Sequence, residues 1–211
     1  MARLADLDAV TFDANGTLIR LVDPVPELER ALLERGVERP ARAIRHAFET
    51  EGRAYAGRAA ERRAPAAFSK LKQECTEIFL DELGAELDPA AFAPYYVSAM
   101  RFEPVPGALD SLERLRRHGL ALAVVANFDP TLHDRLEQLG LGSAFSTVVT
   151  PADAAAAKPD PRIFALALER LGVAPDRSLH IGDGAVDAAG AAAAGMNFAW
   201  TPITQALQDW A

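Results

Sequence analysis

The spacing of apolar residues along the chain predicts its secondary structure. A short apolar run at 9–12 (Ala-Val-Thr-Phe) is typical of a buried strand, and a polar loop follows it. From residue 106 onward, amphipathic segments alternate with apolar runs. Strands are predicted here at 120–126, 147–150, 179–181 and 197–200, and helices at 109–118, 129–140, 160–172 and in the segment that ends at 195. Because strands separated by helices pair in parallel, we predict an α/β fold with a doubly wound parallel sheet.

A long helical insertion is predicted after the first strand. Residues 20–102 lack a strand pattern, and prolines and glycines divide them into about four helices. The signals are acids before first-turn prolines, glycines at helix ends and two further prolines: Asp23-Pro24, Asp88-Pro89, Gly36, Gly84, Pro40 and Pro65. We therefore predict two domains, an α/β core of 1–19 and 103–211 and a helical unit of 20–102.

Composition and charge narrow the class of partner. Half of the 211 residues are hydrophobic, and the net charge of -8 disfavours attraction to nucleic acid or to anionic lipid. The longest apolar run, 120–126, is too short to cross a bilayer, and the N-terminus lacks an apolar targeting segment. Cys75 is the only cysteine, so no intrachain disulfide can form. We expect a cytoplasmic protein with a small-molecule partner and neither a nucleic-acid nor a membrane partner.

Polar residues follow four of the predicted strands, at the edge where such sheets bind ligands. They are Asp13 to Thr17 after the first strand, Asn127 after the second, Lys158 after the third, and Asp183 and Asp187 after the fourth. Carboxylates, a hydroxyl, an amide and a lysine around one point suit phosphoryl transfer to a carboxylate. One carboxylate attacks, another binds Mg²⁺, and a cation neutralises the phosphoryl oxygens.

These segments resemble, in order, the four motifs of the haloacid dehalogenase superfamily. Asp13-Ala14-Asn15-Gly16-Thr17 is similar to the first motif, Asp-x-Asp-Gly-Thr, and Ala126-Asn127 stands at the second. Lys158-Pro159 is similar to the third motif, and Gly182-Asp183 with Asp187 to the fourth. The resemblance covers nearly the whole chain. It implies a Rossmann-like core, a C1-type helical-bundle cap in the insertion, and catalysis through an aspartyl intermediate.

The resemblance also implies a role for each motif residue. Asp13 is similar to the nucleophile and to a metal ligand, Asp183 is similar to a second ligand, and the main-chain carbonyl of Asn15 ordinarily completes the Mg²⁺ site. The remaining implied roles are a donor to the substrate anion (Thr17), its counter-charge (Lys158), and an acid that positions this lysine or the water on the metal (Asp187). Together they imply a Mg²⁺-dependent phosphatase of a small phosphorylated metabolite.

Two positions depart from the motifs. Phosphatases of this superfamily carry, at the position of Asn15, an aspartate that protonates the leaving oxygen and then activates water, and an amide does neither. Loss of a general acid or base typically slows turnover ~10²–10⁴-fold, so alkyl phosphates should react slowly and aryl or acyl phosphates should suffer less. Ala126 replaces a hydroxyl that binds the transferring group, and the Asn127 amide could substitute in part. Asn15-Gly16 is an Asn-Gly pair, which is prone to deamidation, and deamidation would turn Asn15 into an acid. An engineered substitution at this position would also make Asn15 misleading.

Two other functions stay open at this point. Haloacid dehalogenases proper also lack that aspartate and work without metal, but they usually have Tyr there and lack the acid that Asp183 supplies. A catalytically impaired member that binds an anion or a partner is the other alternative. Simpler interpretations also apply to single residues: Asp187 could cap a helix, Lys158 could be a solvated surface lysine, and Asn127 fits a structural or a functional place equally.

Overall fold

The computed structural model describes residues 3–59 and 65–210, and the chain divides into two compact units. One unit comprises Met1–Arg20 and Glu103–Ala211, and the other comprises Leu21–Phe102. The sequence predicted an α/β core of 1–19 and 103–211 and a helical cap of 20–102. The assignment of these ranges to functional domains stays a prediction.

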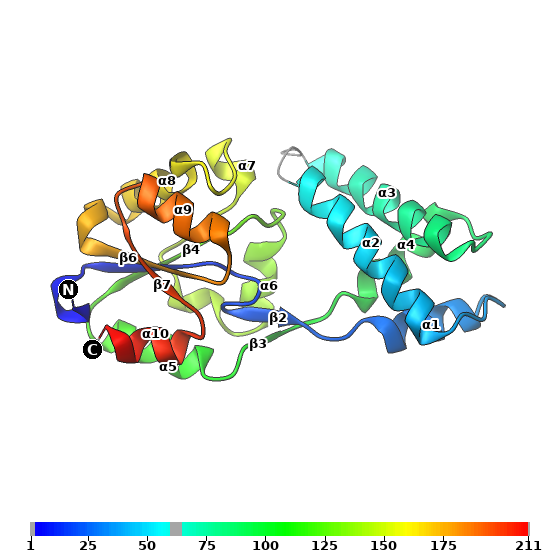
Figure 1. Cartoon of the computed structure of the whole chain (residues 1–211), viewed down its shortest axis with the longest axis horizontal. Coiled ribbons are helices and arrows are strands. Elements are labelled where there is room, and N and C mark those ends of the chain that lie inside the picture. Colours follow the sequence, from blue (N-terminus) through cyan, green and yellow to red (C-terminus); the bar gives the residue numbers. More distant parts are fainter. Residues whose placement is uncertain (1–2, 60–64, 211) are drawn as a thin grey trace. The chain divides into compact units, whose positions relative to one another are not determined.

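A five-stranded parallel sheet forms the centre of the first unit (Figure 1). Its central strand is β1 (Ala9–Phe12), and the strand order is β5-β4-β1-β6-β7. The other strands are β4 (Ala121–Val125), β5 (Thr147–Val149), β6 (Ser178–Gly182) and β7 (Asn197–Trp200). Every residue of β1 and β6 is buried, as expected for parallel strands that are covered on both faces. All pairings are parallel, so the carboxyl ends of the strands meet at one edge.

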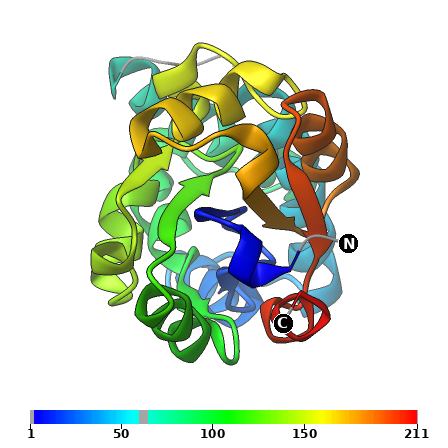
Figure 2. The ribbon, with the colours of Figure 1, turned by 90° about the vertical axis from the view of Figure 1, so that its left-hand side faces the viewer.

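Helices cover both faces of this sheet (Figures 1 and 2). Helices α8 (Pro161–Leu171) and α9 (Ala185–Ala193) pack together on one face, and α5 (Ala108–Arg117) and α10 (Ile203–Asp209) pack together on the other. The unit also contains α6 (Leu132–Gln138), α7 (Pro151–Ala154), η1 (Leu4–Asp6), η2 (Gly142–Ala144) and η3 (Pro175–Arg177). The predicted fold class, a doubly wound parallel α/β sheet with an inserted helical unit, is confirmed.

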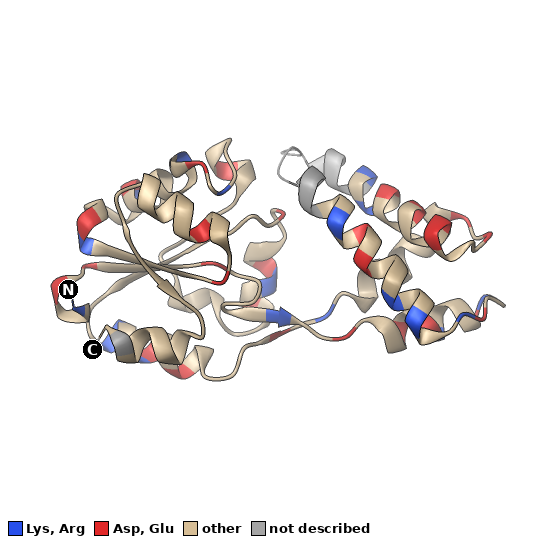
Figure 3. Cartoon of the chain, in the orientation of Figure 1, with Lys and Arg blue, Asp and Glu red and all other residues tan. Residues whose placement is uncertain are grey.

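The second unit is built from helices around its own apolar core. These are α1 (Val25–Leu33), α2 (Ala41–Ala59), α3 (Pro65–Leu83) and α4 (Pro89–Ala99). Buried side chains of all four meet, among them Leu28, Ile44, Phe79 and Phe92. Acidic and basic residues are interspersed along these helices and those of the first unit (Figure 3). Within the described ranges, no helix combines the length and the apolar character that a bilayer span requires.

Several elements of the fold differ from the sequence-based expectation, and the short helices α7 and α10 were not predicted. The insertion was expected to lack strands, but β2 (Ile19–Leu21) and β3 (Phe102–Pro104) form a two-stranded sheet at its ends. Three residues are too few to show a period of two, and this pairing joins residues about 80 positions apart. The helix expected from residue 129 begins instead at Leu132, because the Asp129 carboxylate accepts the Thr131 N–H at 2.8 Å and closes a turn before the helix.

Candidate active site

Asp13 lies where the central strand of the sheet ends. It directly follows β1, and its main-chain N–H donates to the carbonyl of Ile181 at 2.9 Å, which continues the β1–β6 pairing by one residue. The residue is only 8% exposed. Burial raises the pKa of its carboxyl group to about 6. The positive charge of Lys158 lowers this pKa in part, and the negative charge of Asp187 raises it further. At neutral pH the group is therefore mostly ionised, as a nucleophile must be.

Lys158 is buried between two carboxylates. Its side chain is 2% exposed; Nζ donates to Oδ1 of Asp13, and to Oδ1 of Asp187 at 2.6 Å. Its main chain is held by the side-chain amide of Asn127, which accepts the Lys158 N–H at 2.7 Å and donates to the Lys158 carbonyl at 3.0 Å. The interpretation of Lys158 as a solvated surface lysine is thus wrong. The amide of Asn127 is directed at the loop that carries the lysine, and its expected contact with the transferring group stays a prediction.

Asp187 lies in the first turn of α9 with both carboxylate oxygens hydrogen-bonded. Oδ2 accepts the Gly184 N–H at 3.0 Å, as a helix-capping residue does. Oδ1 faces Lys158 and lies 3.1 Å from Nε2 of His180. Burial alone would raise the pKa of Asp187, but the His180 hydrogen bond and the Lys158 charge outweigh it and hold the pKa at about 2. The residue both caps the helix and contacts the lysine.

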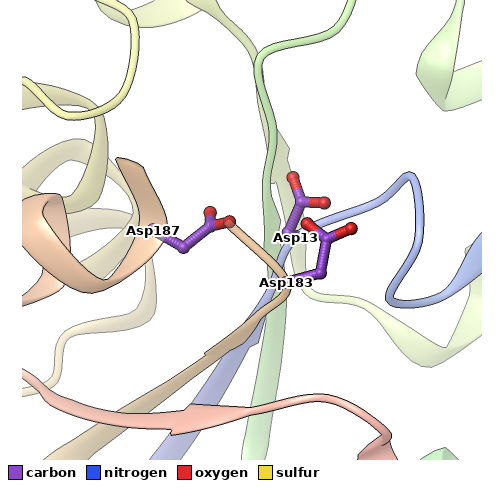
Figure 4. Close-up of side chains that lie close together, drawn as sticks. All are labelled: Asp13, Asp183 and Asp187. Carbon is purple, nitrogen blue, oxygen red and sulfur yellow. The ribbon is translucent and has the colours of Figure 1, made fainter. Parts of the chain in front are cut away.

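Asp183 completes a group of three carboxylates at this sheet edge. It follows β6, and carboxylate oxygens of Asp13, Asp183 and Asp187 lie within 4.8 Å of one another (Figure 4). Partial burial and the negative charge of Asp187 raise the pKa of the Asp183 carboxyl. Gly16 makes the approach possible: its φ is +85°, and a Cβ there would lie 2.1 Å from Oδ2 of Asp183. Oxygen ligands in such a group suit a hard cation such as Mg²⁺.

The other two residues of the first motif lie in the loop after β1. Thr17 is fully buried, and among the described residues its Oγ1 is the one buried side-chain oxygen or nitrogen without a hydrogen-bond partner. An unpaired buried hydroxyl is costly, so this group has a hydrogen bond to offer to a ligand or to water. Asn15 is exposed and forms a bridge with Ile19 through its main chain. Ala126, after β4, is buried.

One polar residue that sequence reasoning did not place in the site contacts it, and a second contacts the site through the first. His180, in β6, contacts Asp187, and its Nδ1 lies 2.8 Å from Oγ1 of Thr11 in β1. The available signal was a polar residue in the middle of each of two buried strands: Thr11 in Ala-Val-Thr-Phe and His180 in Ser-Leu-His-Ile-Gly.

Comparison with known proteins is consistent with this geometry. A family model described as haloacid dehalogenase-like hydrolase matches residues 7–195. The Bos taurus protein named haloacid dehalogenase-like hydrolase domain-containing protein 3 is 33% identical over 219 residues, covering 93% of this chain and 82% of its own length. The phosphoglycolate phosphatase of Pseudomonas putida is 32% identical over 198 residues, covering 89% of this chain and 66% of that protein.

A solved structure has a similar fold. The L-2-haloacid dehalogenase of Xanthobacter autotrophicus aligns with a TM-score of 0.68 at 29% identity, covering 92% of this chain and 77% of that chain. The chain is thus similar both to a phosphatase and to a dehalogenase, and the choice between these activities depends on particular residues of the site.

Proposed function

This chain belongs to the haloacid dehalogenase-like hydrolase family, and on that premise we propose that it is a Mg²⁺-dependent phosphatase of a small phosphorylated metabolite. The observation that carries the proposal is the cluster at the sheet edge: Asp13 contacts the buried ammonium of Lys158, and the carboxylate of Asp183 lies beside it. A nucleophile, a counter-charge and an oxygen ligand are thereby within reach of one phosphoryl group.

In the proposed reaction, a carboxylate oxygen of Asp13 attacks the phosphorus atom. The bond from phosphorus to the leaving oxygen breaks, an aspartyl phosphate forms, and water then hydrolyses it to release phosphate. Lys158 offsets the negative charge of the transferring group, and the unpaired hydroxyl of Thr17 donates to one of its oxygens. Asn127 contributes by holding the main chain of Lys158 in place.

The residues present fit a magnesium ion. Asp13 and Asp183 would hold it through carboxylate oxygens, and the main-chain carbonyl of Asn15 would complete the protein ligands. When bound, the ion would offset charge on the phosphoryl oxygens. Asp187 belongs to the same acidic group, but its oxygens already accept hydrogen bonds from Gly184, Lys158 and His180. We therefore assign Asp187 to positioning the lysine.

The amide at Asn15 limits the proposed reaction to good leaving groups. No carboxylic acid stands at this position to protonate the leaving oxygen, so an alkyl phosphate should turn over ~10²–10⁴-fold more slowly than with an aspartate. Aryl and acyl phosphates leave without full protonation and should be the better substrates. The helical unit, as a cap, would set which metabolite is accepted, and a cytoplasmic location stays a prediction.

Dehalogenation is the alternative that a specific finding favours, namely the likeness to the Xanthobacter autotrophicus enzyme. Phosphatase is nevertheless favoured over dehalogenase, because phosphatases are among the relatives and the acidic group offers a metal site. Without Mg²⁺, three carboxylates around one lysine would repel a 2-haloacid anion rather than attract it.

The test is a panel of aryl, acyl and alkyl phosphates and 2-haloacids, each with Mg²⁺ and with a chelator. We expect phosphate release that requires Mg²⁺ and is fastest for acyl and aryl phosphates. Halide release that survives chelation would establish the dehalogenase instead. If no substrate releases phosphate or halide but inorganic phosphate still binds, the protein is a catalytically impaired member of the family that acts as a binding protein.

A further inference from the structure

Two polar residues, Thr11 and His180, lie side by side in the apolar centre of the sheet, and His180 contacts Asp187 of the site. His180 of β6 and Thr11 of β1 are register partners on adjacent central strands, and both are 0% exposed. The imidazole lies edge-on against Phe164, with ring centroids 4.9 Å apart. Among apolar neighbours, each ring nitrogen has one polar partner: Thr11 Oγ1 at Nδ1 and Asp187 Oδ1 at Nε2. Such a buried histidine persists only when both nitrogens are satisfied.

The chemistry of the two partners decides the tautomer. An ionised carboxylate only accepts hydrogen bonds, so Nε2 must carry the proton that points at Asp187. Burial lowers the pKa of His180 to about 4 despite the hydrogen bond to Asp187, so the ring is neutral at physiological pH. Nδ1 then carries a lone pair and accepts a hydrogen bond from the hydroxyl of Thr11. The result is a chain of hydrogen bonds from Thr11 through His180 and Asp187 to Lys158.

We propose that His180 is a positioning residue: as the neutral Nε2–H tautomer it holds the Asp187 carboxylate in the orientation that places Lys158 against Asp13. Oδ1 of Asp187 accepts from both His180 and Lys158, so rotation of this carboxylate would move the lysine. Gly184 restrains only the other oxygen. The catalytic consequence rests on the proposed phosphatase function, whereas the positioning itself does not.

The first test needs no variant and no activity. A two-bond proton–nitrogen NMR spectrum of the ¹⁵N-labelled full chain near pH 7.5 reports the tautomer of each histidine, and His46, His118 and His133 are exposed and serve as internal references. We expect a neutral Nε2–H ring for His180. A protonated ring, or the Nδ1–H tautomer, would overturn the inference.

The second test follows the lysine itself. The chain has only three lysines, and Lys70 and Lys72 are exposed, so an ammonium signal that exchanges slowly with water belongs to Lys158 and should vanish in Lys158→Met. In His180→Leu this exchange should be roughly tenfold faster, because one hydrogen bond to a charged group is lost. His180→Gln retains an N–H donor and should restore the slow exchange. Unchanged exchange in a folded His180→Leu would refute the positioning role.

Thr11→Val is the matched control. This substitution removes the hydroxyl at the start of the same series of buried hydrogen bonds and should lower the stability of the protein. The N–H of His180 that donates to Asp187 stays in place. Its Lys158 exchange should therefore stay close to that of the parent chain. If Thr11→Val speeds exchange as much as His180→Leu, the effect is general loosening of the core and the inference fails.

Kinetics then separate this inference from the proposed function. With an acyl phosphate and Mg²⁺, His180→Leu should lose roughly 10–100-fold in kcat with KM within about twofold, as is usual when a partner behind a site residue is removed. His180→Gln should recover most of this loss. If the parent chain hydrolyses no phosphate, the proposed function fails while both NMR tests still decide the positioning. If the parent chain hydrolyses phosphate but His180→Gln does not recover the activity that His180→Leu loses, only the inference fails.

Discussion

At the scale of single residues, the site is governed by one buried cation between two buried carboxylates. The desolvation free energy of buried charges is larger than the stabilisation that an exposed ion pair provides. Close contacts between the buried charges must offset this cost. Lys158 contacts Asp13 and Asp187, and Asn127 fixes its main chain. The arrangement is therefore sensitive to loss of the lysine.

Lys158→Met should destabilise the chain strongly. It leaves two facing carboxylates without their counter-charge, and breaking a buried pair in this way typically costs about 3–5 kcal/mol. Urea unfolding at neutral pH measures the change. Lys70→Met is the matched control, because Lys70 is 75% exposed and its ion pair with Glu74 is on the surface. Equal midpoints for the two variants would contradict the prediction.

Asn15→Asp should raise turnover selectively. A carboxylic acid restored at this position would protonate the leaving oxygen, so kcat on an alkyl phosphate should rise ~10²-fold or more, and kcat on an acyl phosphate should change much less. Mass spectrometry of the parent chain must first show that Asn15 is not deamidated. A uniform change on both substrates would disprove the assignment of the missing acid.

At the scale of elements, the loop after β1 approaches the loop after β6 so closely that a side chain at Gly16 does not fit. Gly16→Ala should cost about 1–2 kcal/mol through its left-handed backbone and should also displace Asp183, whose Oδ2 would lie 2.1 Å from the new Cβ. Because Asp183 is displaced, the affinity for Mg²⁺ should fall tenfold or more, which corresponds to a loss of about 1.4 kcal/mol of binding free energy or more. Calorimetry measures this affinity.

Gly36→Ala is the control for this effect. Gly36 also has a positive φ, +76°, but nothing lies within 4 Å of a Cβ there. It should therefore show the backbone strain and retain Mg²⁺ affinity. Equal Mg²⁺ affinities in the Gly16 and Gly36 variants would show that Asp183 is not a ligand.

The helices of the inserted unit enclose a buried carboxyl group of their own. Glu51 of α2 accepts a 2.6 Å hydrogen bond from the hydroxyl of Tyr96 in α4, and burial raises the pKa of Glu51. The folded chain therefore binds this proton more tightly than the unfolded chain. Its contribution to stability is present below the unfolded pKa and is lost as pH rises through the folded pKa.

Glu51→Gln should remove this pH dependence, because an amide oxygen still accepts from Tyr96 without bearing charge. Relative to the variant, the parent chain should lose stability as pH rises above about 4.3, the unfolded pKa of a glutamate. Thermal unfolding from pH 4 to 8 measures the difference. Glu49→Gln, an exposed position on the same helix, is the control and should track the parent chain. A constant difference across this range would contradict the interpretation.

At the scale of the whole molecule, binding of Mg²⁺ should stabilise the folded chain. At a concentration of one hundred times Kd the expected gain is about 2.7 kcal/mol, which raises Tm by about 5–10 °C for a chain of this size. Chelator should reverse the shift, and Asp183→Asn should abolish it. Asp160→Asn, which alters an acid that caps α8, should retain it. A Tm that does not respond to Mg²⁺ would count against the metal site.

Much of the fold was accessible from the sequence because its signals are local. Apolar runs of strand length, helical periodicity and proline or glycine at helix ends each depend on a few neighbouring residues. The short strands β2 and β3 were missed because their pairing joins distant segments. The start of α6 was misplaced because Asp129 closes a turn instead of opening the helix.

The sequence alone placed Asp13, Lys158, Asp183 and Asp187 at one edge of the sheet, since parallel strands bring their carboxyl ends together and polar residues follow four of them. Only the tertiary structure decided what those residues do to one another. Asn127 points its amide at the main chain of Lys158, and Asp187 is shared between that lysine and His180. These contacts depend on strand register and on side-chain direction across 7 to 31 residues of chain, and no local pattern encodes either.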